Sequence, residues 1–245
     1  MKVTALGVGD AFSARFYSTC LLVEHDGAHL LIDCPHPIRK VLAESGAGVD
    51  LPDLDAVVLT HLHADHCSGL EGLGFFSFFV AQRPMPLLTH PGVGKRLWER
   101  LAPGMDTLML DLDAPPTLKE LDDYFAIAPL STDHPVAHGP FSIEARWTKH
   151  HVPTTALRIT AGGHTLGYSA DTAFDPDLIA WLAEADLVIH ETNLGTHTPI
   201  DDLLGLDDAL KERMRLVHYP DWFDVDSCPI ACLRQGETVT VAPAG

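Results

Sequence analysis

Four potential metal ligands stand within six residues, directly after a short apolar run. The run Ala56–Leu59 is too short for a helix and contains neighbouring valines, which predicts a buried strand that ends where the polar residues begin. The ligands that follow are His61, His63, Asp65 and His66. Because side chains alternate along an extended backbone, the first two imidazoles should project to the same side, and the last two residues can close over the same point from a turn. The sequence therefore predicts a metal-binding loop at the end of a strand.

Other apolar runs of the chain also end in residues that can bind a metal. Strands are expected over 141–148, 165–169, 187–189 and 215–217. Close behind them come His150 and His151, Asp171, His190 with Glu191, and His218, respectively. Strand ends hold side chains on a rigid frame and leave them accessible, as a catalytic metal site requires. The pattern therefore predicts that one edge of the sheets gathers the ligands.

Strand and helix signals alternate along the whole chain without a low-complexity linker. A hairpin is expected across Asp26-Gly27, and helices are expected over 37–45, 93–101, 177–185 and 201–213, whereas residues 102–140 are hard to assign. We therefore expect a single α/β domain over residues 1–245. No apolar window is long enough to span a membrane, and the first residues lack the apolar segment of a signal peptide. Together with an odd number of cysteines without C-x-x-C spacing, this predicts a cytoplasmic protein.

The balance of charged residues limits which substrates the protein can bind. The chain has 16 Lys and Arg against 34 Asp and Glu, a net charge of −18. Nucleic-acid binders need a basic patch that neutralises phosphates, and the basic residues here are scattered. We therefore expect a small-molecule substrate held mainly by metals, with neither nucleic acid nor membrane as a partner. An acidic surface that serves only solubility explains the charge equally well.

The order of these ligands resembles that of the metallo-β-lactamase superfamily of binuclear metallohydrolases. Segments 6–11, 31–34, 168–172 and 189–192 resemble its ribonuclease Z and small-molecule phosphodiesterase-like branch, while residues 75–140 match least. The resemblance implies a four-layer αββα sandwich, in which two mixed sheets lie back to back with helices outside.

The resemblance also implies two divalent metal ions. His61 and His63 would bind one ion, Asp65 and His66 the other, and Asp171 would bridge them. The remaining histidine is His150 or His151, and alignment on Pro153 favours His150. The implied ligand set is His61, His63, Asp65, His66, His150, Asp171 and His218. Nitrogen and oxygen ligands suit zinc, with manganese or iron as alternatives.

Hydrolysis is the activity that this ligand set implies. A metal-bridged hydroxide would attack a small phosphodiester such as a cyclic phosphate. His197 lies where ribonuclease Z-like phosphodiesterases carry a general acid, and Glu191 would orient its imidazole. Asp65 would be both a metal ligand and a catalytic residue. The alternative for His197 is an exposed side chain beside a helix cap.

Departures from the family pattern reduce the range of possible substrates. Between His150 and Asp171 the chain has room for two strands and a turn at Gly162-Gly163, but not for the arm with which ribonuclease Z binds tRNA. A lactonase or β-lactamase acting on a carbonyl is the alternative enzyme, although the tyrosine that lactonases carry after the bridging aspartate is absent. A metal-binding protein without hydrolytic activity is the alternative outside enzymes. The aromatic segment 75–79 is expected in the core, with a substrate pocket or a homodimer contact as alternatives.

Overall fold

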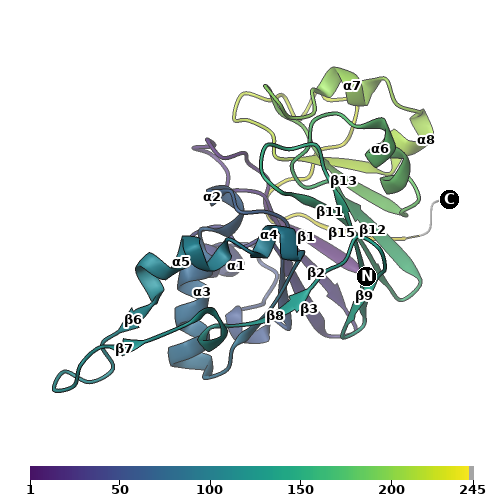
Figure 1. The fold of residues 1–245 in the computed structure, drawn as a ribbon. Helices are drawn as coiled ribbons and strands as arrows, with labels where there is room; N and C mark the ends of the chain where they lie inside the picture. The colour runs from purple at the N-terminus through teal and green to yellow at the C-terminus, as the bar shows by residue number, and fades with distance from the viewer. Residues whose placement is uncertain (243–245) are drawn as a thin grey trace.

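Two β-sheets form the centre of the computed structural model, which describes residues 1–242 (Figure 1). The last three residues of the expected 1–245 domain lie outside the described part of the chain. The first sheet has seven strands in the order β15-β1-β2-β3-β4-β5-β8. Their bounds are β1 (Lys2–Gly7), β2 (Cys20–His25), β3 (Ala28–Ile32), β4 (Ala56–Leu59), β5 (Met85–Thr89), β8 (Phe125–Pro129) and β15 (Thr238–Thr240). Pairing is antiparallel from β15 through β3 and parallel from β3 to β8, so the sheet is mixed.

The second sheet has six strands in the order β14-β13-β12-β11-β10-β9. Their bounds are β9 (Val136–His138), β10 (Phe141–Trp147), β11 (Thr155–Ala161), β12 (His164–Tyr168), β13 (Leu187–Glu191) and β14 (Met214–Val217). Strands β9 to β12 are antiparallel and β12 to β14 parallel, so this sheet is mixed too. A separate hairpin of β6 (Thr107–Leu108) and β7 (Thr117–Leu118) projects away from the body (Figure 1).

Helices cover the outer face of each sheet. Beside the first sheet lie α1 (Ile38–Glu44), α2 (Ala64–Cys67), α3 (Leu70–Phe76), α4 (Pro91–Gly94) and α5 (Leu97–Met105), with a π-helix over Ser77–Ala81 and 3-10 turns at Leu51–Asp53 and Leu121–Asp123. Beside the second sheet lie α6 (Pro176–Leu182), α7 (Ile200–Leu204) and α8 (Asp208–Glu212). None of these helices combines the length and the apolarity that a bilayer crossing requires.

Three apolar cores separate these layers. On β4, Val58 faces the core between the two sheets, whereas its neighbour Val57 packs against α1, α3 and α5. The second sheet divides its residues in the same way, with Ile189 inside and Val188 against α6, α7 and α8. Because successive strand residues face opposite sides, strands that are covered on both faces read as continuous apolar runs. The three cores confirm the expected αββα order of layers.

The expected hairpin is confirmed, and two expected helices are wrong. Asp26 and Gly27 both have positive φ, as a tight hairpin turn requires. The helix expected over 93–101 is divided between α4 and α5, because the backbone leaves the helical region at Arg96. The helix expected over 201–213 is divided between α7 and α8. Gly205 ends the first, and the side chain of Asp207 accepts a hydrogen bond from the backbone of Ala209 to begin the second.

The aromatic segment 75–79 belongs mainly to the outer core. The rings of Phe75 and Phe78 lie 5.8 and 5.6 Å from that of Tyr124, whereas Phe79 is exposed. The expectation of a core role is therefore confirmed for the inner rings, and the homodimer contact stays a prediction.

Candidate metal centre

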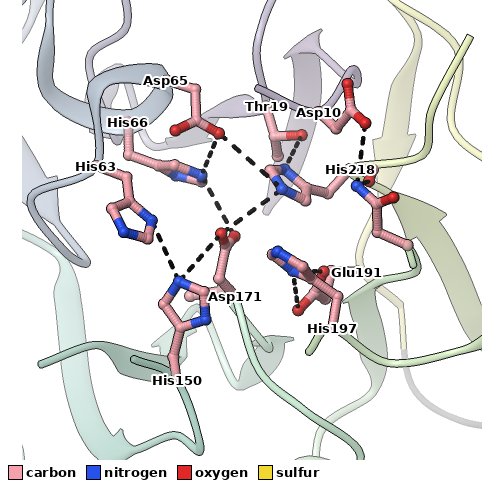
Figure 2. Close-up of polar contacts among 12 residues, drawn as sticks. Asp10, Thr19, His63, Asp65, His66, His150, Asp171, Glu191, His197 and His218 are labelled. Carbon is pink, nitrogen blue, oxygen red and sulfur yellow. Dashed lines mark hydrogen bonds and ion pairs between the residues drawn. The ribbon is translucent and has the colours of Figure 1, made fainter. Parts of the chain in front are cut away.

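The carboxyl ends of strands from both sheets meet at one edge of the sandwich, where the side chains in Figure 2 gather. Parallel pairing directs β3 and β4 to this edge, and likewise β12, β13 and β14. Strand β10 reaches it as well, because β10 and β12 are both antiparallel to β11. The side chains carried there are Asp33, His61, His150, Asp171, Glu191 and His218. Topology thus gathers residues that are far apart in the sequence.

The backbone at this edge is strained at three strand ends. Asp33, Ala170 and His218 have φ values of 60°, 48° and 59°. Residues with side chains rarely adopt this left-handed region, which costs energy that the surrounding structure must offset. Asp33 and His218 directly follow a strand and Ala170 lies one residue further on, so the strained residues stand where the strands enter the site.

The first group of ligand atoms lies around His63. Its Nδ1 is 3.2 Å from Nε2 of His61 and 3.2 Å from Nε2 of His150. One carboxylate oxygen of Asp171, Oδ2, is 3.6 Å from Nε2 of His61 and 3.7 Å from Nε2 of His150. Ligand atoms bonded tetrahedrally to one zinc ion are about 3.3 Å apart, since Zn–N bonds are about 2.0–2.1 Å long. These spacings suit a single divalent ion.

The second group lies on the other side of Asp171. Nε2 of His66 is 3.3 Å from Oδ2 of Asp65 and 3.3 Å from Oδ1 of Asp171. Nε2 of His218 is 3.6 Å from Oδ2 of Asp171 and 4.0 Å from Oδ2 of Asp65. In each group, all four atoms lie within 4.8 Å of one another. Asp171 contributes to both groups and is placed to bridge two ions.

Residues directly behind the ligand histidines orient the imidazoles by hydrogen bonds. The buried carboxylate of Asp33 lies 2.8 Å from Nδ1 of His66 and accepts hydrogen bonds from the backbone and hydroxyl of Thr60. Nδ1 of His218 lies 3.3 Å from the hydroxyl of Thr19 (Figure 2). Partners of this kind fix which ring nitrogen faces a metal. Asp33 thus lies directly behind the imidazole of His66, and Thr19, which no pattern in the sequence marks, lies behind that of His218.

Burial and neighbouring charges shift the pKa values of these groups. Burial lowers the pKa of His150 to about 4 and that of His61 well below its usual range, so both imidazoles are neutral, as ligands must be. Burial would raise the pKa of Asp171, but the imidazoles of His218 and His66 outweigh it and hold that pKa well below its usual range. Burial opposes a charged His66, yet the carboxylates of Asp171 and Asp33 raise its pKa well above the ordinary value.

Two buried atoms that face each other at the centre are among those without hydrogen-bond partners in the described part of the chain. They are Nε2 of His66 and Oδ1 of Asp171, which face each other in the second group. Buried polar atoms of this kind usually find a partner, so an unpartnered pair marks the place of a ligand. A cation between them would accept an electron pair from each. The residues present therefore fit divalent metal ions.

His197 stands beside both groups. Its Nδ1 lies 2.8 and 3.0 Å from the carboxylate oxygens of Glu191 (Figure 2). Its ring lies 5.3 Å from that of His150 and 5.4 Å from that of His218, which belong to different groups. Glu191 is buried, and burial followed by the charge of Asp171 raises its pKa well above the usual range. With Nδ1 held by Glu191, the other ring nitrogen of His197 is free to act at the centre.

The structure brings all nine of the predicted site residues together at this edge. The seven expected ligands form the two groups, and His197 with Glu191 flanks them. The exposed His151 lies outside both groups, with its ring centre 4.6 Å from that of His63 and 4.2 Å from that of His150 and tilted to both. The roles of these residues stay predictions.

Replacing His150 by alanine should reduce the bound metal far more than replacing His151. Losing a ligand should weaken metal binding by more than about 100-fold, because changes behind the ligands already cost about 10–100-fold. The measurement is metal content per chain after dialysis of the two variants. A larger loss of metal in His151→Ala would show that His151, and not His150, is the ligand.

Comparisons with known proteins show the family and the fold of the chain. A family model described as anti-Pycsar protein Apyc1 matches residues 1–236. An anti-Pycsar protein Apyc1 of Bacillus phage 010DV004 is 34% identical over 237 residues, which cover 90% of either chain. The metallo-β-lactamase fold protein YhfI from Bacillus subtilis superposes with a TM-score of 0.75 at 25% identity, covering 97% of this chain and 98% of that one. A diphosphatase of the PhnP family superposes with a TM-score of 0.78 at 16% identity, covering 99% and 98%. The expected metallo-β-lactamase fold is thereby confirmed.

Proposed function

The chain belongs to the Apyc1 family of anti-Pycsar proteins, and we propose that it uses two metal ions to open a small cyclic phosphodiester. It is a metal-dependent, phosphodiesterase-like hydrolase with the metallo-β-lactamase fold. The number and kind of ions, the substrate class and the roles of individual residues are the proposal.

Two zinc ions suit the site best. Three imidazoles share the first group with Asp171, whereas the second combines two imidazoles with two carboxylates. Zinc readily takes four nitrogen and oxygen ligands, although manganese and iron accept the same donors. When bound, two such ions would lower the pKa of a shared water and polarise a phosphoryl oxygen.

The residues of the chain position the reaction and supply a proton. Asp171 bridges the two groups and so sets the distance between them. Asp65 is a ligand in the second group, and its carboxylate faces the same space. His197, with Nδ1 hydrogen-bonded to Glu191, would donate a proton from its other nitrogen to the departing oxygen. The placement of this pair beside both groups is the observation that carries the proposal.

A small cyclic substrate fits the surroundings. Strands β11 and β12 are joined by a tight turn at Gly162 and Gly163, so no arm extends between His150 and Asp171. The net charge of −18 opposes a long polyanion. The proposed substrates are therefore small cyclic phosphates, with 3′,5′-cyclic nucleotides as the first class to test.

A panel of four substrate types tests this proposal. We expect turnover of bis(p-nitrophenyl) phosphate and of cyclic nucleotides, and little or none of acyl-homoserine lactones or a chromogenic cephalosporin. Removal of metal by a chelator should abolish the turnover, and added zinc should restore it. Lactone turnover without phosphodiester turnover would refute the proposed substrate class, and no turnover at all would favour a metal-binding role.

A further inference from the structure

A cavity of about 450 Å³ opens beside His197. Segments far apart in the sequence line it, among them Phe12, Leu194 and Trp222. His197 belongs to the wall of this cavity and also faces the metal centre. His197 therefore lies between the cavity and the ligand groups.

Large apolar side chains around this cavity are exposed. The exposed fractions are 93% for Phe12, 62% for Leu194 and 65% for Trp222. Clustered apolar surface in contact with water is unfavourable, and such clusters commonly mark binding sites. Two aromatic rings and a leucine beside a catalytic histidine suit a flat apolar group.

Polar side chains hold the exposed residues in place. Oδ1 of Asp10 accepts a hydrogen bond from the backbone of Phe12 at 3.0 Å, and Oδ1 of Asn193 accepts one from that of Leu194 at 2.8 Å. Asn193 also donates to Oδ2 of Asp10 at 3.1 Å and to the backbone oxygen of His218 at 3.2 Å. The cavity wall is thus bonded directly to the backbone of a metal-ligand residue.

The loop that carries Trp222 is tied to the loop that carries Phe12. Oδ2 of Asp221 accepts a hydrogen bond from the backbone of Ala14 at 2.9 Å, and Arg15 donates to the backbone oxygen of Asp221 at 2.8 Å. These bonds fix the two aromatic residues on neighbouring, connected loops. Such a frame is prepared for a ligand and needs little ordering when one binds.

Charge determines which part of a substrate fits here. The described residues that line this cavity include the acids Asp10 and Asp221 but no lysine or arginine. A phosphate would be repelled from this cavity and attracted to the metal ions. By contrast, a second cavity beside His63 is lined by Lys95, Arg96 and Arg100 against one acid, Glu99, and suits an anion better. The cavity beside His197 therefore favours an uncharged part of the substrate.

We propose that this cavity binds the base of a cyclic nucleotide between Phe12 and Trp222 while the cyclic phosphate lies at the metal centre. The proposal rests on the proposed phosphodiesterase function and names its substrate more closely. Aromatic side chains stack on the flat face of a base, and this contact is lost when the aromatic ring is removed. Phe12 and Trp222 would thus determine specificity without taking part in the chemistry.

The test compares two cyclic phosphodiesters, a 3′,5′-cyclic nucleotide and trimethylene phosphate, which has a similar ring but no base. In Trp222→Ala and Phe12→Ala, we expect kcat/KM for the nucleotide to fall about tenfold and that for trimethylene phosphate to stay unchanged. Trp222→Phe should retain most of the nucleotide activity. Val80→Ala, which trims an apolar side chain of 64% exposure on the outer helical layer, is the matched control and should change neither value.

A second measurement is independent of turnover. A nucleoside without phosphate should bind the wild-type protein, as followed by NMR line broadening, and should bind Trp222→Ala more weakly. If no phosphodiester is cleaved, the proposed function fails, but weaker nucleoside binding by the variant would still support the base site. Equal losses for both substrates, or unchanged nucleotide kinetics and nucleoside binding, would overturn the proposal. So would a change in the association state of Trp222→Ala with unchanged kinetics, because the cavity would then be a protein contact.

Discussion

Replacing Asp171 by alanine is expected to empty both metal sites at once. Asp171 is the one described residue shared by the two ligand groups, with Oδ2 3.6 Å from His61 and Oδ1 3.3 Å from His66. The imidazoles of His218 and His66 hold the pKa of Asp171 low, so its carboxylate is charged. We expect metal content to fall from two ions to less than one per chain. Phosphodiester hydrolysis should fall on the order of 1000-fold or more, because in the proposed mechanism the ions would supply both the nucleophile and the charge stabilisation.

Metal analysis after dialysis, together with steady-state kinetics, checks this result. Asp177→Ala is the matched control, because Asp177 is exposed in the first turn of α6 and belongs to neither ligand group. It should retain both ions and full activity. If Asp171→Ala kept two ions with wild-type affinity, the bridging role would be wrong.

Much of this centre could be predicted because the residues that form it lie next to the strands that carry them in the sequence. In 61–66, strand and ligands are contiguous, so the apolar run and the histidine spacing together indicate a metal loop. Asp171 and His218 also stand just beyond apolar runs, and the fold brings strand ends to one edge. The family resemblance supplied the pairing between these segments, which spacing alone does not contain.

What the sequence did not predict depends on contacts between distant segments. The bond between Asp10 and Asn193 joins residues from opposite ends of the chain, and no local pattern announces it. Strand β5 was missed because Pro86 lies inside it, and proline usually argues against a strand. The division of 201–213 into two helices follows from capping by Asp207. This capping signal is local, but the apolar spacing across 201–213 favoured one continuous helix.

Replacing His197 by alanine is expected to lower kcat for a cyclic nucleotide by about 100- to 10,000-fold while metal content stays at the wild-type level. The reason is that an alkoxide leaves poorly without a proton, and His197 lies beside both ligand groups with Nδ1 held by Glu191. Steady-state kinetics and metal analysis on the same preparation measure the two effects. Glu191→Gln should show a smaller loss, because an amide oxygen can still accept the hydrogen bond from His197.

The leaving group separates proton donation from a structural role for His197. The p-nitrophenolate released from bis(p-nitrophenyl) phosphate is stable without protonation, so His197→Ala should slow this substrate much less than a cyclic nucleotide. His134→Ala controls for the loss of an imidazole, since His134 is exposed, contacts Ser131 and lies outside the ligand groups. Equal losses for both substrates would mean that His197 supports the centre without donating the proton. Loss of metal in His197→Ala would point to the same conclusion, because His197 and His218 lie close enough to share an ion.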